Sequence, residues 1–200
     1  MIKISLRWRL SRLITVSFVM KILIVYSTVE GHTRRIAEFL ATETCLVHHN
    51  PIVISTSRQM KIDVSDFDAV VVAASIYAGQ YSNEIVDYIT MHASRLNETP
   101  AIFLSVGLSI INKDTGVRRS LEETTKHFLH VTGWNPLMVE QVAGALLYSR
   151  YGFIKKMLMR SIMKKAGAGI DTSRDYVYTN WDSLRHSMEE FITKAEPVHQ

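Results

Sequence analysis

Apolar residues along this chain gather in short, nearly continuous runs. A run of about six such residues, often β-branched, predicts a strand that is buried on both faces of a sheet. A weaker strand is expected at Ile52–Ser55. The stronger runs, KILIVY, AVVVAA, AIFLSV and VAGALL, occupy Lys21–Tyr26, Ala69–Ala74, Ala101–Val106 and Val142–Leu147.

Between the runs, apolar residues recur at the three- and four-residue spacing of one helix face, as at Ile36, Ala37 and Leu40. Strand and helix therefore alternate, which predicts an α/β fold: a doubly wound sheet of five parallel strands with helices on both faces. One domain is expected over residues 20–196, with an insertion at about 148–176. The expected helices are Thr33–Glu43, Glu84–Arg95, Leu121–Val131 and Trp181–Lys194.

The loop after the first strand reads STVEGHT. Short hydroxyl side chains, a glycine and the start of a helix together suit a phosphate group. The loop lacks the lysine of a Walker A motif and the G-x-G-x-x-G of a dinucleotide fold, which favours a monophosphate. An ordinary strand–helix turn is the alternative. The residues assigned to the phosphate are Ser27, Thr28, Gly31, His32 and Thr33.

Two further loops follow neighbouring strands at the edge where open parallel sheets bind ligands. SIYAGQY places two tyrosines around a glycine, which suits a planar ring, although aromatic packing around a turn would look the same. SVGLS contains a glycine that allows close backbone approach. Together the three loops predict a flavin mononucleotide (FMN) site. The residues expected around the ring are Ser75, Ile76, Tyr77, Ala78, Gly79, Tyr81, Ser105, Val106 and Gly107, with Gly144 as a weaker candidate.

Composition narrows the class of protein. The 200 residues are 47% hydrophobic and 21% charged, which excludes a disordered, collagen-like or coiled-coil chain. No apolar run reaches the roughly 18 residues that span a bilayer, which excludes a polytopic membrane protein. The single cysteine, Cys45, lies in an apolar stretch and is expected to be a buried, unreactive thiol. No spacing of ligating residues predicts a metal site.

The net charge of +4 is unevenly distributed. The first 20 residues contain four basic residues and no acid, so the remainder holds 19 Lys and Arg against 19 Asp and Glu. Residues 1–19 are expected to be an N-terminal extension. They resemble a signal peptide or an amphipathic membrane anchor, but an upstream start codon, with Met20 as the natural start, is the favoured explanation.

The predicted insertion concentrates positive charge. The stretch from Leu146 to Arg174 contains seven basic residues and one acidic residue, which gives it a net charge of +6. Alternate rows of apolar and basic side chains predict an amphipathic helix, which is typical of a membrane surface, a partner or an acidic ligand. A helix packed on its own sheet, with a solvated basic face, is the alternative. Nucleic-acid binding is disfavoured because no known nucleic-acid recognition motif accompanies the charge. The residues assigned to a membrane or substrate surface are Arg150, Lys155, Lys156, Arg160, Lys164 and Lys165.

Residues 20–194 resemble the flavodoxin superfamily, since KILIVYST followed by EGHT is similar to its phosphate-loop signature. Within it, the chain resembles the menaquinone-dependent protoporphyrinogen IX dehydrogenases of bacterial haem synthesis. That resemblance lies in AASIYAGQY, VAGALLYSRY, the basic methionine-rich stretch at 155–175 and VYTNWD. His32 and Gly107 depart from the family, in which other polar residues are expected there.

The resemblance implies a flavodoxin-like fold and an enzyme that oxidises protoporphyrinogen IX with FMN and reduces menaquinone. Because that quinone is dissolved in lipid, it also implies a peripheral protein on the cytoplasmic side of the bacterial inner membrane. No residue is assigned as a catalytic acid or base. A flavodoxin electron carrier, a soluble NAD(P)H:quinone oxidoreductase and a membrane-docking protein with a degenerate site remain alternatives. Whether the chain forms a homo-oligomer is open.

Overall fold

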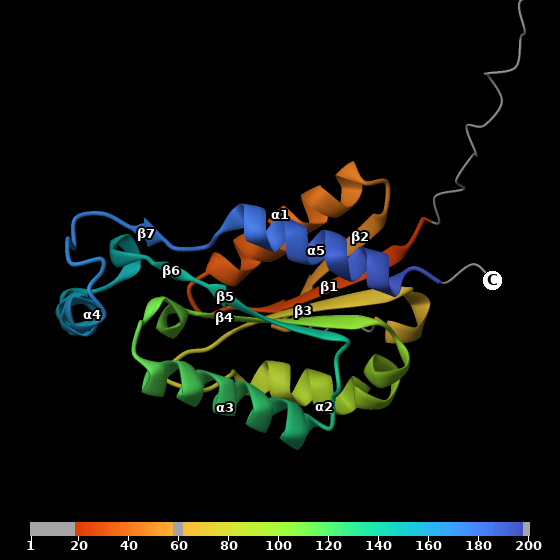
Figure 1. Ribbon diagram of the computed structural model, residues 1–200, viewed down its shortest axis with the longest axis horizontal. Helices are drawn as coiled ribbons and strands as arrows, with labels where there is room; N and C mark the ends of the chain where they lie inside the picture. The colour runs from red at the N-terminus through yellow and green to blue at the C-terminus, as the bar shows by residue number, and fades with distance from the viewer. Residues whose placement is uncertain (1–18, 58–61, 198–200) are drawn as a thin grey trace, which may run out of the picture.

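A parallel sheet of five strands forms the centre of the computed structural model, which describes residues 19–57 and 62–197 (Figure 1). The strand order is β2-β1-β3-β4-β5. The chain reverses its direction of travel across the sheet between β1 and β3, which makes the loops after these two strands the expected ligand site. The strands are β1 (Lys21–Ser27), β2 (Asn50–Ser55), β3 (Ala69–Ser75), β4 (Ala101–Gly107) and β5 (Met138–Ala143).

Two helices cover each face of the sheet (Figure 1). Helices α1 (His32–Leu46) and α5 (Trp181–Ala195) lie on one face, and α2 (Asn83–Glu98) and α3 (Thr115–Thr132) lie on the other. The expected doubly wound α/β class is confirmed. Short 3-10 turns occur at Val64–Asp66, Leu108–Ile111 and Tyr148–Arg150.

The apolar runs of the sequence follow from this double cover. Ile22 and Ile24 of β1 pack against α1 and α5, whereas Leu23 and Val25 face the helices on the other side, and all four are fully buried. Successive residues of a strand point to opposite faces. A strand that is covered on both faces therefore needs an apolar residue at each position.

The fifth strand is a correction to the sequence-based prediction. It was expected at Val142–Leu147, but β5 begins at Met138, four residues before the predicted start, and ends at Ala143. As an edge strand it has a single buried residue, Val142, and it includes Glu140 and Gln141, so it lacks a continuous apolar run. The run instead continues into β6 (Ala145–Leu146), which packs in a small separate core.

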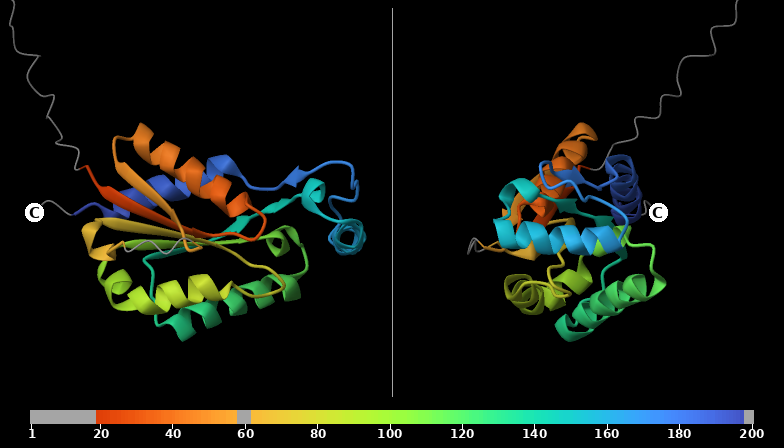
Figure 2. Two further views of the ribbon diagram at one scale, coloured as in Figure 1. Left: turned by 180° about the vertical axis from the view of Figure 1, so that it is seen from behind. Right: turned by 90° about the vertical axis from the view of Figure 1, so that its left-hand side faces the viewer.

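The segment between β5 and α5 extends past the carboxyl ends of the strands (Figure 2). Strand β6 pairs with β7 (Tyr176–Val177), and between them lies helix α4 (Phe153–Lys165). These elements, which we call the insertion, are held by their own core. It consists of Leu146, Tyr148, Tyr151 and Met163.

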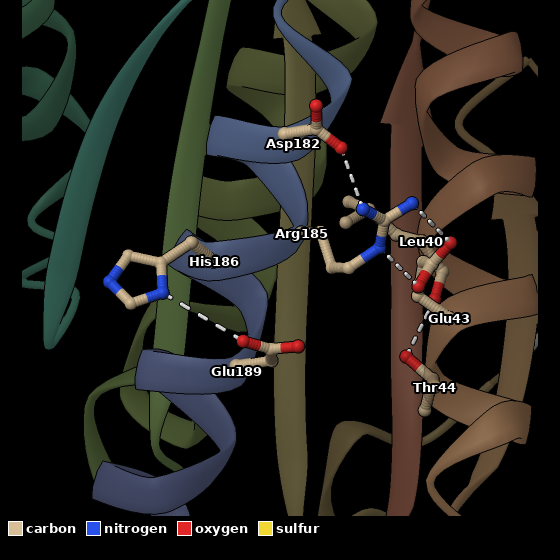
Figure 3. Close-up of polar contacts among 7 residues, drawn as sticks. All are labelled: Leu40, Glu43, Thr44, Asp182, Arg185, His186 and Glu189. Carbon is tan, nitrogen blue, oxygen red and sulfur yellow. Dashed lines mark hydrogen bonds and ion pairs between the residues drawn. The ribbon is translucent and has the colours of Figure 1, made fainter.

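On the face of the sheet covered by α1 and α5, an ion pair joins these two helices. The Nε of Arg185 lies 2.8 Å from Oε2 of Glu43, and its Nη1 lies 2.7 Å from Oδ1 of Asp182 (Figure 3). Glu43 is largely shielded, with 17% of its side chain exposed. The pair orients α5 against α1, whose first turn belongs to the candidate site.

Two other expectations concern residues outside the core. Cys45 is exposed, not buried as predicted, because it lies on the outer side of α1 next to the buried Thr44. Residues 1–18, which carry the predicted basic extension, lie outside the described residues. Over the ranges that are described, the helices are too short or too polar to cross a membrane.

Candidate functional site

A cavity of ≈ 370 Å³ lies at the carboxyl edge of the sheet, between the loops after β1, β3 and β4 and helix α4 of the insertion. Its volume falls in the range of about 300–1,000 Å³ that is typical of small-molecule sites. The structure therefore brings most of the predicted residues together. Those that line it are Thr28, His32, Thr33, Ser75, Ile76, Tyr77, Ala78, Gly79, Val106, Gly107 and Gly144.

The loop after β1 leaves the start of α1 open to an anion. Gly31 is the residue before the helix and has a φ of +87°, a conformation that favours glycine. No side chain caps the helix, so the backbone N–H groups of its first turn lack intrahelical partners. Thr28 shapes the loop, because its hydroxyl oxygen accepts a hydrogen bond of 2.9 Å from the N–H of Gly31. This arrangement suits a phosphate group.

The loop after β3 is a tight hairpin. The N–H of Tyr77 donates to the carbonyl of Gln80 at 2.9 Å, and the N–H of Gln80 donates back at 3.1 Å. Ala78 and Gly79 between them have φ values of +50° and +78°, as in a type I′ turn. The left-handed conformation costs Ala78 about 1–2 kcal/mol. Such strain is common where backbone is held against a ligand.

Tyr81 and Ser105 correct the prediction that they would surround a ring. The ring of Tyr81 packs on Phe103 and Phe128 beneath the sheet, at centroid distances of 5.5 and 4.5 Å. Its hydroxyl donates to Ser105 Oγ at 2.8 Å, and Ser105 is fully buried. The hairpin turns the chain back toward the core, which is why only the first of the two tyrosines borders the cavity. Burial raises the pKa of Tyr81.

Ser27 and Gly31 belong to the phosphate loop without lining the cavity. The Ser27 hydroxyl lies 2.8 Å from the hydroxyl of Ser82, the residue that precedes α2, and Ser27 is 7% exposed. Its side chain therefore ties β1 to α2. Gly31 contributes through the backbone conformation described above.

His32 is a buried, neutral member of the loop. Its Nε2 lies 2.7 Å from the hydroxyl of Thr179, and that hydroxyl donates to the carbonyl of Ala143 at 2.6 Å. Because the hydroxyl proton is already used, Nε2 of His32 must be the donor, which places the lone pair on Nδ1. Burial, and secondarily the charge of Arg35, lowers the pKa of His32 to about 4.

Glu30 joins the phosphate loop to the insertion. The hydroxyl of Tyr151 donates to Oε2 at 2.5 Å, and Nζ of Lys155 lies 2.6 Å from Oε1. Arg150 donates to the backbone carbonyl of Glu30. Burial and this carboxylate raise the pKa of Tyr151. We call these four residues, Glu30, Arg150, Tyr151 and Lys155, the Glu30 clasp.

The clasp was missed by the sequence analysis. Its partners are separated by 120 to 125 residues, and no local pattern connects them. Arg150 and Lys155 were assigned to a membrane or substrate surface, whereas the structure uses both to contact Glu30. Lys155 also lies over the rings of Tyr151 and Tyr77, 4.3 and 5.1 Å from their centroids.

Helix α4 forms an apolar wall of the cavity. Leu158 and Ile162 line it, whereas Ile154, predicted in the same helical row, is 84% exposed. Phe153 beside it is 79% exposed. The further wall residues are Met159, Met163 and Ala166. The basic residues of α4 outside the clasp do not line the cavity: Lys156 is half-buried, and Arg160, Lys164 and Lys165 are exposed.

The fold and the three loops define a domain of the flavodoxin type. The family model for the flavodoxin domain matches residues 23–173. Among solved structures, the flavodoxin of Streptococcus pneumonia TIGR4 has a TM-score of 0.51 at 16% identity and covers 87% of this chain and 99% of its own. A short-chain flavodoxin associated with a PDU bacterial microcompartment has a TM-score of 0.53 at 17% identity, over 89% of this chain and 100% of its own. These likenesses show the fold.

Curated relatives narrow the family further. The protoporphyrinogen IX dehydrogenase (quinone) of Escherichia coli (strain K12) is 33% identical over 171 residues, 86% of this chain and 94% of the relative. The relative of the same name from Leishmania major is 32% identical over 174 residues, 86% of this chain and 74% of its own. This chain thus belongs to the flavodoxin domain family and, within it, to the family of quinone-dependent protoporphyrinogen IX dehydrogenases. The predicted enzyme family is confirmed.

The first prediction tests the reassignment of Tyr81 to the core. Tyr81→Phe should lower the free energy of unfolding by about 1–2 kcal/mol, because Ser105 loses its hydrogen-bond donor in a buried setting. The affinity for FMN should stay unchanged. Denaturant unfolding and flavin titration measure the two. Tyr77→Phe, at the cavity, is the control and should leave stability within about 0.5 kcal/mol. A loss of FMN affinity in Tyr81→Phe without a loss of stability would contradict the core assignment and support a contact between Tyr81 and the flavin ring.

The second prediction concerns His32 and pH. Its pKa is 6.5 in the unfolded chain and about 4 in the fold, so between these values the unfolded state binds more protons. Stability should therefore fall by about 2–3 kcal/mol between pH 7 and pH 4.5 through this residue. His32→Gln should lack this component, whereas the exposed His186→Gln should keep it. Identical pH dependence in the wild type and His32→Gln, measured by urea unfolding, would refute the assignment.

Proposed function

We propose that this protein oxidises protoporphyrinogen IX to protoporphyrin IX with FMN as cofactor and menaquinone as electron acceptor, in haem biosynthesis. The observation that carries the proposal is the joint lining of one cavity by a phosphate-type loop, two ring-type loops and the apolar side of α4. The names of the curated relatives support the substrate and a quinone acceptor.

The residues present fit FMN. The uncapped first turn of α1, with the hydroxyls of Thr28 and the buried Thr33, would hold the phosphate. The hairpin at Ala78 and the backbone at Gly107 would border the ring. Gly144 lies close to this backbone, since a Cβ there would meet the Gly107 carbonyl carbon at 3.6 Å. When bound, FMN accepts hydrogen from a donor and passes electrons to a quinone.

The wall formed by α4 fits the proposed substrate. Protoporphyrinogen is a large apolar ring system with two propionates. Leu158, Met159 and Ile162 offer a flexible apolar contact beside the flavin loops, and thioether side chains adapt well to irregular shapes. The basic residues of the same helix suit the charge of the substrate's two propionates. The wall residues of α4 would thus bind and orient the substrate and exclude water from the flavin ring.

The proposed location is the cytoplasmic side of the bacterial inner membrane. Phe153 and Ile154 at the start of α4 are 79% and 84% exposed, which is unusual for such large apolar residues side by side. Basic residues of the same helix would contact anionic headgroups, as in other interfacial helices. This position would bring a lipid-dissolved quinone to the cavity.

The third prediction tests the chemistry. Under anaerobic conditions, the FMN-loaded protein should oxidise protoporphyrinogen IX when menaquinone is present, and protoporphyrinogen alone should bleach the flavin absorbance. Both are followed optically, and protein stripped of flavin is the control. Rapid bleaching of the flavin by NAD(P)H, with no porphyrinogen oxidation, would favour a soluble quinone reductase and contradict the proposal. Bleaching by neither would favour an electron carrier.

The fourth prediction tests the membrane contact. Replacement of the basic row by glutamate (Lys156→Glu, Arg160→Glu and Lys164→Glu) should weaken binding to anionic vesicles at least about tenfold, because each surface cation contributes about 1 kcal/mol. Flavin should remain bound. The matched control reverses three basic residues of α3, Arg118, Arg119 and Lys126. If the two variants float with vesicles to the same extent, the proposed contact between α4 and the membrane is wrong.

A further inference from the structure

The phosphate loop by itself carries the wrong charge for a phosphate. Between Ser27 and Thr33 the only ionic side chain at neutral pH is the carboxylate of Glu30, since His32 is neutral in its hydrogen-bonded tautomer. A phosphate monoester at neutral pH carries a charge of about −1.5 to −2. The start of α1 offsets this with only about half a positive charge. Arg34 and Arg35 follow in the first turn of α1, where Arg34 is paired with Glu38. A further cation next to the loop would strengthen the binding of the phosphate.

The insertion brings two cations to this loop. Lys155 lies 2.6 Å from the Glu30 carboxylate and neutralises it. Arg150 lies over Gly31: its Nη1 is 2.7 Å, its Cζ 3.7 Å and its Nη2 3.9 Å from the position that a Cβ would take on Gly31. A side chain at position 31 would displace the guanidinium from this place. With both cations counted, the charge at the loop changes from −1 to +1.

Arg150 also has donors to spare. Its guanidinium carries five N–H donors, and one nitrogen, Nη1, donates to the Glu30 carbonyl. The side chain is exposed at the edge of the loop. A phosphate held by the N–H groups that follow Gly31 would lie next to the residue that the guanidinium covers, so the remaining donors could meet it directly or through one water.

We propose that Arg150 is a phosphate-binding residue, so that the insertion supplies the positive charge that selects FMN over riboflavin. The inference rests on the proposed function, because it assumes that the flavin phosphate binds at the start of α1. It goes beyond it by assigning a residue of the insertion to cofactor selection, while Lys155 neutralises the one acid of the loop. Arg150 therefore links the presence of the insertion to the phosphorylated form of the cofactor.

A purely structural role makes a different prediction. If Arg150 only holds the insertion against Glu30, its loss loosens α4 over the whole cavity, and FMN and riboflavin weaken together. If Arg150 binds the phosphate, only FMN weakens, because riboflavin has no phosphate. The ratio of the two dissociation constants separates these roles.

The experiment titrates flavin-stripped protein with FMN and with riboflavin, following the quenching of flavin fluorescence. Arg150→Gln should weaken FMN at least about tenfold, the size expected for a charge-assisted hydrogen bond, and riboflavin less than about twofold. Arg150→Lys, which keeps the charge, should recover part of the preference. Arg174→Gln is the matched control: it removes one charge from the insertion, where Arg174 contacts Asp171 and Tyr176.

Each result decides between the two claims. An equal loss of FMN and riboflavin in Arg150→Gln, or no loss of either, overturns the inference while leaving the FMN site in place. A wild-type protein that binds neither flavin overturns the proposed function itself. A preference for FMN that declines with added salt in the wild type, but not in Arg150→Gln, supports the ionic contact.

Discussion

The contact between Glu30 and the insertion is the interaction on which the enclosure of the cavity depends. Helix α4 is joined to the insertion's own small core, and the Glu30 carboxylate fastens it to the phosphate loop through Tyr151 and Lys155 at 2.5 and 2.6 Å. The Glu30 side chain is only 19% exposed, so the contact is shielded from water more than a surface ion pair. Loss of one partner would leave a poorly solvated charge.

The sheet and the insertion have separate tasks. Strands β1, β3 and β4, buried on both faces, fix the ends of three short loops with little freedom, and the strained Ala78 is held there by the hairpin around it. This framework is shared with flavodoxins and is sufficient to position a phosphate and a ring. The insertion adds an apolar wall and several cations. In the proposed function, this addition distinguishes an enzyme with a large, acidic substrate from an electron carrier.

Sequence patterns predicted what depends on local periodicity or on double burial. The three central strands were found because nearly every position is apolar. The loops that follow them were found because strand ends define a common edge. The edge strand β5 was misplaced because most of its residues are partly exposed and two of them, Glu140 and Gln141, are polar. Tyr81 was assigned to the site because a tight turn reverses the chain without a signal in composition. The Glu30 clasp joins residues 120 or more positions apart, which periodicity does not record.

A flavin that binds at the phosphate loop is proposed to be held at the same time by the insertion, through Arg150 of the Glu30 clasp. Amide hydrogen exchange with and without saturating FMN tests this most directly. Bound FMN should slow exchange both at the start of α1, from His32 onward, and along α4 at residues 153–165. Protection of the loop with unchanged exchange in α4 would contradict the role of the insertion, and unchanged exchange in both would contradict the site.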